Sequence, residues 1–94
     1  MNKKTALYPG TFDPITFGHL DIIKRASKIV DHIYVGVANN KEKKCLFSLK
    51  DRIDIVKKTI SSLPKQIKNK IKVVSFDMLT VNYCKKINAS IIIR

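Results

Sequence analysis

The residues of this chain best suited to chemistry are Gly18 and His19, which stand where a turn-rich loop becomes a helix in the stretch LYPGTFDPITFGHLDI (Leu7 to Ile22). The first N–H groups of a helix have no partner within it, and they lie at the positive end of the helix dipole. A glycine there lets an anion approach the backbone, and a histidine adds a directed hydrogen bond. The pair therefore predicts a phosphate-binding helix N-terminus. The alternative is that His19 only caps the helix or packs beside it, because a single Gly-His pair is a weak motif.

The same loop contains Asp13 followed by Pro14. An aspartate before a proline is typical of an Asx turn followed by a residue with a fixed φ. We therefore expect this pair to shape the loop without touching a substrate.

Alternating strand and helix patterns surround the loop. β-prone runs predict strands at Thr5–Tyr8, His32–Ala38, Ile71–Phe76 and Ala89–Ile93. Helical spacing of apolar residues predicts helices from Gly18 through Val30, from the N-cap Ser48 to near Pro64, and over Met78–Asn88. The basic run KQIKNK at 65–70 is expected to be a surface connection.

Strict alternation of strands and helices predicts a parallel α/β sheet with right-handed crossovers, in the order β-α-β-α-β-α-β. Such a sheet is half of a doubly wound fold, in which ligands bind beyond the carboxyl ends of the strands. The unusual residues fall at those ends: PGTFDP follows the first strand, NNKEKK the second, Leu79 and Thr80 the third, and Arg94 the fourth. We therefore expect the functional site at this edge of the sheet.

The amino-acid composition limits the kinds of molecule that this protein is expected to bind. Nineteen Lys and Arg against seven Asp and Glu give a formal charge of +12, which favours polyanionic partners. The lysines are scattered, without the Arg and aromatic clustering of a nucleic-acid groove, so a basic nucleic-acid-binding module is the less favoured alternative. Cys45 and Cys84 show no metal-ligand or disulfide pattern. With neither a signal peptide nor an apolar run of membrane length, we expect a cytoplasmic protein without a membrane partner.

Three separated motifs, in the same order, resemble those of the phosphopantetheine adenylyltransferases, which belong to the nucleotidyltransferase superfamily. Thr16-Phe17-Gly18-His19 matches the (H/T)xGH motif, FSLKDRI (47–53) is similar to the FSxEER stretch, and INASIIIR (87–94) is similar to the ATxLIRG segment. The resemblance covers essentially the whole chain. It implies a Rossmann-like sheet that forms the first part of a 3-2-1-4-5 order, with residues 1–94 as one nucleotidyltransferase-like domain truncated on its C-terminal side.

The resemblance also implies an activity. Members of this family transfer an adenylyl group from ATP to 4′-phosphopantetheine by direct in-line attack, giving dephospho-coenzyme A and pyrophosphate in coenzyme A synthesis. Mg²⁺ accompanies the ATP, and the full-length family forms a homo-hexamer. Because segments that follow in the family are not in this sequence, the alternative is a non-catalytic fragment that binds nucleotide or phosphate.

Residues of the first loop take roles from the resemblance. Thr11 resembles the threonine that lies between ATP and the pantetheine phosphate, and the Phe12 backbone resembles a contact to ATP phosphates. Gly18 and His19 belong to the ATP site, with His19 as the catalytic group that stabilises the transition state.

The later loops complete the implied site. Lys43, in NKEKKCLF, resembles a catalytic and substrate-binding lysine that neutralises the reacting phosphates, and Lys44 is its rival in register. Leu79 and Thr80 match the turn whose backbone receives the pantetheine arm. Arg94 matches an arginine that binds the pantetheine phosphate, a role suited to a planar bidentate donor.

Overall fold

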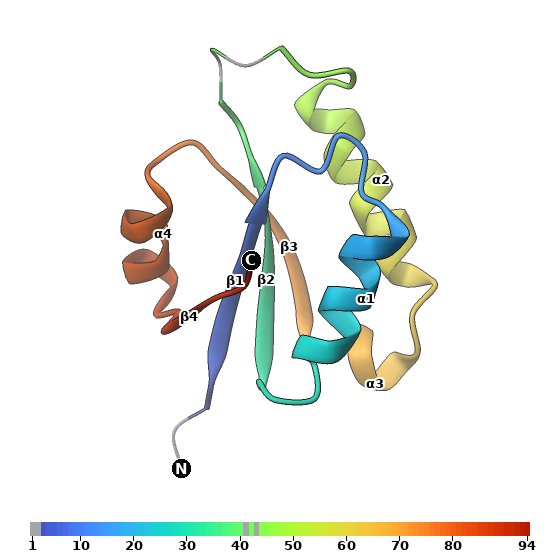
Figure 1. Ribbon diagram of the computed structural model, residues 1–94, viewed down its shortest axis with the longest axis vertical. Coiled ribbons are helices and arrows are strands. Elements are labelled where there is room, and N and C mark those ends of the chain that lie inside the picture. Colours follow the sequence, from blue (N-terminus) through green and yellow to red (C-terminus); the bar gives the residue numbers. More distant parts are fainter. Residues whose placement is uncertain (1–2, 41, 43) are drawn as a thin grey trace.

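The computed structural model describes residues 3–40, 42 and 44–94, and a four-stranded parallel sheet forms its centre (Figure 1). The strands are β1 (Thr5–Gly10), β2 (His32–Ala38), β3 (Ile71–Phe76) and β4 (Ile91–Ile92). Their spatial order is β3-β2-β1-β4, with Leu7 of β1 opposite both Tyr34 and Ile92. This order confirms the predicted Rossmann-like α/β class and the 3-2-1-4 part of the expected topology.

The helices cover the two faces of the sheet unequally. α1 (Phe17–Ala26), α2 (Leu49–Ser61) and α3 (Lys65–Lys68) lie on one face, and α4 (Thr80–Ile87) lies on the other (Figure 1). Because side chains alternate along a strand, each face has its own core. Ile33, Val35 and Val37 are fully buried in the larger core beneath α1 and α2. Leu7 is fully buried in the smaller core, toward α4.

The smaller core depends on Gly36 in β2. A Cβ at this position would lie 2.9 Å from the Phe76 ring and 3.0 Å from Leu7. Phe76 also stacks on Tyr83 of α4, with ring centroids 4.9 Å apart. The absence of a side chain at Gly36 therefore lets α4 and the end of β3 pack closely on the sheet.

The bounds of β2 and β3 match the prediction, whereas β1 is longer than expected. The sequence pattern places Pro9 and Gly10 after the first strand, and this is wrong, because they pair with Gly36 and Val37 of β2. Proline interrupts a sheet only where its missing N–H is needed. β4 pairs with β1 only at Ala6 and Leu7, so β1 has no partner strand on that side at Pro9.

The first helix is shorter than predicted, ending at Ala26 and not reaching Val30. The Ser27 hydroxyl donates a hydrogen bond to the Lys24 carbonyl at 2.6 Å, and Ile29 N–H donates to the Ala26 carbonyl at 3.0 Å. These bonds satisfy the last turn locally and let the chain leave the helix. Ile29, expected on the buried stripe, is 70% exposed as a result.

The other elements agree in type and differ in extent. Ser48 caps α2 as predicted, since its hydroxyl accepts a hydrogen bond from Asp51 N–H at 3.1 Å. The expected surface connection at 65–70 contains α3, because the Pro64 carbonyl accepts hydrogen bonds from Ile67 and Lys68 and starts a new turn. The last helix and strand are shorter than predicted, at Thr80–Ile87 and Ile91–Ile92.

Candidate functional site

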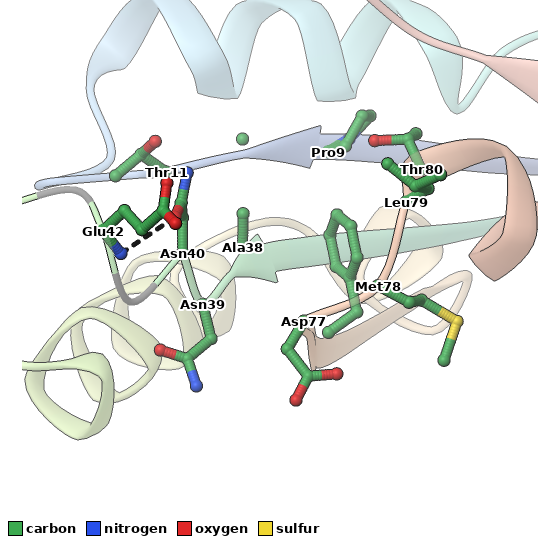
Figure 2. Close-up of a pocket in the computed structure, with 12 residues that line it drawn as sticks. Pro9, Thr11, Ala38, Asn39, Asn40, Glu42, Asp77, Met78, Leu79 and Thr80 are labelled. Carbon is green, nitrogen blue, oxygen red and sulfur yellow. Dashed lines mark hydrogen bonds between the residues drawn. The ribbon is translucent and has the colours of Figure 1, made fainter.

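A cleft of about 940 Å³ opens at the carboxyl ends of β1, β2 and β3, where the strand pattern predicts a ligand site (Figure 2). Thr11, Asn40 and Glu42 lie at one end of this cleft, and Leu79 and Thr80 lie at the other, beside Pro9. Three of the predicted site residues therefore line one cavity: Thr11, Leu79 and Thr80.

The turn between β3 and α4 forms one wall of the cleft. Leu79 is the N-cap of α4, and no side chain caps this helix end. Leu79 is also 74% exposed, which leaves its side chain open to a ligand. The backbone N–H groups of the first turn of α4 thus begin at the cleft without a side-chain acceptor. The arrangement suits a ligand with polar groups for the backbone and an apolar arm for Leu79.

Phe12 follows Thr11 in the loop after β1 and, like Gly18 and His19, is not among the residues that line the cleft; its backbone is in the left-handed region with φ 48°. Bulky residues seldom adopt this conformation, and they do so where the surrounding structure holds them. The Phe12 ring is buried and meets the rings of Tyr8 and His19 edge-on, with centroids 5.4 and 5.0 Å away. A Cβ at Gly10 would lie 3.1 Å from this ring, so the glycine makes room for it.

His19 is tied to the start of α1 through its Nδ1 atom. Thr16 N–H donates a hydrogen bond to His19 Nδ1 at 2.9 Å, and His19 N–H donates to the Thr16 hydroxyl at 3.3 Å. This reciprocal pair is a capping box. Since Nδ1 accepts a hydrogen bond, the ring proton lies on Nε2, which remains able to donate to a ligand. His19 therefore does cap the helix, and the same bond fixes the orientation of its ring.

Gly18 precedes His19 in the first turn of α1 and is exposed. A Cβ placed on it would meet only the Thr16 hydroxyl, at an ordinary 3.5 Å. Packing within the chain therefore does not require glycine here. The fold alone therefore does not explain why this residue is a glycine. A glycine here would let a ligand approach the backbone closely.

Lys43 lies outside the described residues. Lys44, the alternative to Lys43 in the alignment with the family motif, is exposed. Arg94 follows β4 and is also exposed. Ile93 N–H donates to the Leu7 carbonyl at 2.9 Å, which continues the pairing with β1 beyond Ile92. Arg94 thus follows a segment that runs along β1 toward the edge of the sheet that holds the cleft.

Asp13 braces the first loop against the start of α2, which the sequence interpretation missed. Its carboxylate accepts hydrogen bonds from Leu46 N–H at 2.6 Å and Phe47 N–H at 2.9 Å. The expected Asx turn is therefore wrong, because these partners lie more than thirty residues away in sequence. The Asp13–Pro14 peptide bond is cis. The expectation that the pair shapes the loop agrees with these contacts.

Arg52 is the second residue that sequence reasoning missed. It is 4% exposed, and its guanidinium donates to the carbonyls of Phe47, Thr11 and Ala38 at 3.2, 2.9 and 3.0 Å. One signal was available, since Arg52 stands three residues after Leu49 and four before Val56, on the buried face of α2. A charged residue on such a face indicates a specific polar partner.

The cleft also contains acidic residues that were not predicted. Among the described residues that line it, the ionisable side chains are Glu42 and Asp77. Glu42 N–H donates to the Asn40 side chain at 3.0 Å, which holds the turn after β2 (Figure 2). No Lys or Arg among the described residues lines the cleft.

Buried Tyr8 lies next to the Phe12 and His19 rings. Burial raises the pKa of the Tyr8 phenol, so it stays protonated at physiological pH. Its ring lies 6.1 Å from that of His19, centroid to centroid. Tyr8 therefore supplies packing to the loop and no negative charge.

Within the part of the chain that the structure describes, no group of three or more His, Cys, Asp or Glu side chains is placed to hold a metal ion. Within the same residues, no helix combines the length and apolar character of a membrane span. Neither Cys45 nor Cys84 forms a disulfide bond within these residues.

Comparison with known proteins agrees with the sequence motifs. The chain is 54% identical over 89 residues to a phosphopantetheine adenylyltransferase of Nautilia profundicola, covering 95% of this chain and 54% of that protein. It is 50% identical over 92 residues to the protein of the same name from Vesicomyosocius okutanii, covering 98% of this chain and 55% of the relative. The chain thus spans about half the length of the curated relatives it matches. The predicted resemblance is confirmed.

Solved structures extend the likeness to the fold. A Plasmodium falciparum nicotinic acid mononucleotide adenylyltransferase complexed with NaAD superimposes with a TM-score of 0.79 and 26% identity, over 93% of this chain and 46% of that one. A lipopolysaccharide core biosynthesis protein from Thermoplasma volcanium, 20% identical, shares the fold with a TM-score of 0.70 over 97% of this chain and 73% of its own. A family model described as cytidylyltransferase-like matches residues 7–94. The chain therefore belongs to the cytidylyltransferase-like family.

Proposed function

We propose that this chain carries the phosphate-binding part of an enzyme that transfers an adenylyl group from ATP to 4′-phosphopantetheine. The observation that carries the proposal is the loop that follows β1, in which the rings of Phe12 and His19 meet edge-on while Thr11 of the same loop lines the cleft. The names of the relatives support the choice of substrates. Because the chain spans about half of them, the activity belongs to a protein that also supplies the remaining segments.

In the proposed reaction, a phosphate oxygen of 4′-phosphopantetheine attacks the α-phosphorus of ATP. A new P–O bond forms while the bond to the bridging oxygen of the β-phosphate breaks, and pyrophosphate leaves. No side chain becomes covalently attached, so the protein acts by positioning the phosphates and stabilising their charge. This requirement suits a site made of fixed N–H donors.

The first loop holds the reacting phosphates in this proposal. The Phe12 N–H and the N–H of Gly18 bind ATP oxygens, and His19 Nε2 donates to the α-phosphate as negative charge builds on it. The Nδ1 bond from Thr16 keeps the imidazole proton on Nε2 for this purpose. Thr11 lies between the two substrates.

The remaining roles stay as the resemblance implies them. Leu79 and Thr80 receive the pantetheine arm, an assignment that their place in the cleft supports. Lys43 neutralises the reacting phosphates, and Arg94 binds the pantetheine phosphate. The cytoplasmic location and the homo-oligomer also stay predictions.

Mg²⁺ enters this proposal with ATP. Mg²⁺ is commonly held by substrate phosphates, water and only one or two carboxylates. The described residues contain no cluster of three metal ligands, which fits an ion bound mainly by the triphosphate. When bound, it neutralises phosphate charge, and no protein ligand is assigned to it.

The test is pyrophosphate release with ATP, Mg²⁺ and 4′-phosphopantetheine. It compares this chain with the same chain continued beyond Arg94 by the C-terminal part of the Nautilia relative. In the extended protein, His19→Ala is expected to lower the rate about a hundredfold or more, as loss of a transition-state donor does. His32→Ala is the matched control, because His32 is an exposed histidine at the opposite end of the sheet.

Three outcomes contradict the proposal. An unchanged rate in His19→Ala means that the chemistry does not use this loop. An extended protein that binds ATP without releasing pyrophosphate favours the non-catalytic fragment. Steeply salt-dependent binding of DNA or RNA that His19→Ala leaves unchanged favours the nucleic-acid-binding alternative.

A further inference from the structure

Arg52 is a buried cation whose bonds go to backbone oxygens. Its three hydrogen-bond acceptors are the carbonyls of Phe47, Thr11 and Ala38. No carboxylate among the described residues forms an ion pair with it. A buried charge costs free energy unless its surroundings compensate it. The three carbonyl bonds offset this cost, and one of them reaches a residue that lines the cleft.

The bond to Thr11 falls on the peptide unit that joins Thr11, which lines the cleft, to Phe12. The carbonyl of Thr11 and the N–H of Phe12 belong to the same planar peptide group. Arg52 Nη1 donates to that carbonyl at 2.9 Å. A charge-assisted bond to a carbonyl draws electrons toward its oxygen and strengthens the N–H of the same peptide as a donor.

The direction of this N–H is fixed as well. Phe12 has φ 48°, and its ring is held between Tyr8 and His19. The same Nη1 atom also donates to the Ala38 carbonyl at 3.0 Å, which ties the loop to the end of β2. Arg52 thus holds the Thr11–Phe12 peptide group in place from the interior of the protein, at the edge of the sheet where the cleft opens.

We infer that Arg52 is a positioning residue for phosphate binding, which acts through the Thr11–Phe12 peptide by orienting and polarising the Phe12 N–H. The inference rests on the proposed function, because it assumes that a phosphate oxygen accepts from this N–H. Arg52 is buried and does not line the cleft, so in this inference it supports binding without touching the ligand.

Lys70 supplies a matched control within the same chain. Its ammonium is also partly buried and donates to two carbonyls, those of Ser27 at 2.7 Å and Val30 at 3.4 Å. These bonds lie at the opposite end of the sheet, before β2 and β3. Lys70→Met therefore removes a similar cation from carbonyl oxygens without touching the first loop.

The experiment measures two properties of the chain with Arg52→Met, Arg52→Lys and Lys70→Met, below the unfolding temperature of each variant. The first is the ¹⁵N chemical shift of Phe12 without ligand, which reports electron withdrawal at its peptide nitrogen. The second is the dissociation constant of ATP and of inorganic pyrophosphate. Arg52→Met is expected to move the Phe12 ¹⁵N resonance upfield. It is also expected to raise the dissociation constants of ATP and of pyrophosphate about tenfold or more. Arg52→Lys is expected to fall between wild type and Arg52→Met, and Lys70→Met to match wild type.

The outcomes separate the inference from the proposed function. If wild type binds neither ATP nor pyrophosphate, phosphate binding by this loop fails, and the inference falls with it. If wild type binds both and Arg52→Met binds them equally well, only the inference is overturned. An unmoved Phe12 ¹⁵N resonance overturns it too. If Arg52→Met does not fold, Arg52→Lys decides, because wild-type affinity in that folded variant contradicts a role for the guanidinium geometry.

Discussion

The two walls of the cleft are built in different ways. The loop after β1 is braced from several sides, by Asp13 on the start of α2, by Arg52 on Thr11 and by the capping box of His19. The turn after β3 has an exposed Leu79 and a helix start without a side-chain cap. A wall that stabilises phosphate charge must be preorganised, whereas one that receives a flexible arm can adapt to it. Under the proposed function, the braced wall is the one suited to the reacting phosphates.

The largest expected effect tests the bracing of the first wall through Asp13→Asn. The variant keeps the shape of the side chain, but an amide nitrogen replaces one of the two accepting oxygens, so one backbone N–H loses its acceptor and the other bond loses its charge. We expect a loss of about 1–3 kcal/mol in the free energy of unfolding, measured by urea denaturation.

Asp77→Asn is the matched variant on the second wall. Asp77 is an exposed residue of the turn after β3, so the expected change stays within about 0.5 kcal/mol. Equal losses in the two variants would mean that the two walls do not differ in rigidity.

The sequence predicts the parts of this fold that have local patterns. β2 and β3 are apolar runs bounded by polar residues, and their predicted bounds match the structure. Thr11, Leu79 and Thr80 line the cleft as expected, because strand order places their loops at one edge. The family motifs identified these residues, and the alternation of strands and helices predicted that they lie close together.

The bracing contacts had no such signal. Asp13 and Arg52 reach partners far along the chain, and no periodicity encodes which carbonyl or N–H they will meet. The early end of α1 and the presence of α3 depend on a few local hydrogen bonds, among them those of the Ser27 hydroxyl and the Pro64 carbonyl. Such bonds compete with helical propensity over one turn, which pattern analysis does not resolve.

A second, smaller effect compares the buried tyrosines of the two walls at alkaline pH. Burial raises the pKa of Tyr8, and burial followed by the nearby Tyr34 raises the pKa of Tyr83, from an ordinary value of 10.0. As pH rises past 10.0, the unfolded chain therefore loses these protons before the folded chain does. Stability is present in full below this pH and is lost as pH rises through the folded-state pKa values.

Tyr8→Phe and Tyr83→Phe are each expected to flatten this alkaline loss, as measured by urea denaturation across pH 8 to about 11. A slope that neither substitution changes would contradict the assignment of the alkaline loss to the tyrosines.

The smallest expected effect on stability separates binding from folding at the first wall. In Gly18→Ala the new methyl meets only the Thr16 hydroxyl, at 3.5 Å. Alanine also favours a helix over glycine, so stability should stay the same or rise by up to about 1 kcal/mol. The methyl would nevertheless stand where a phosphate approaches the start of α1, and we expect ATP to bind at least about tenfold more weakly. Gly10→Ala should show the reverse, with a loss of stability, because its Cβ would press on the Phe12 ring at 3.1 Å. Full ATP affinity in a stable Gly18→Ala variant would place the phosphates away from this helix and leave the capping box with only a structural role.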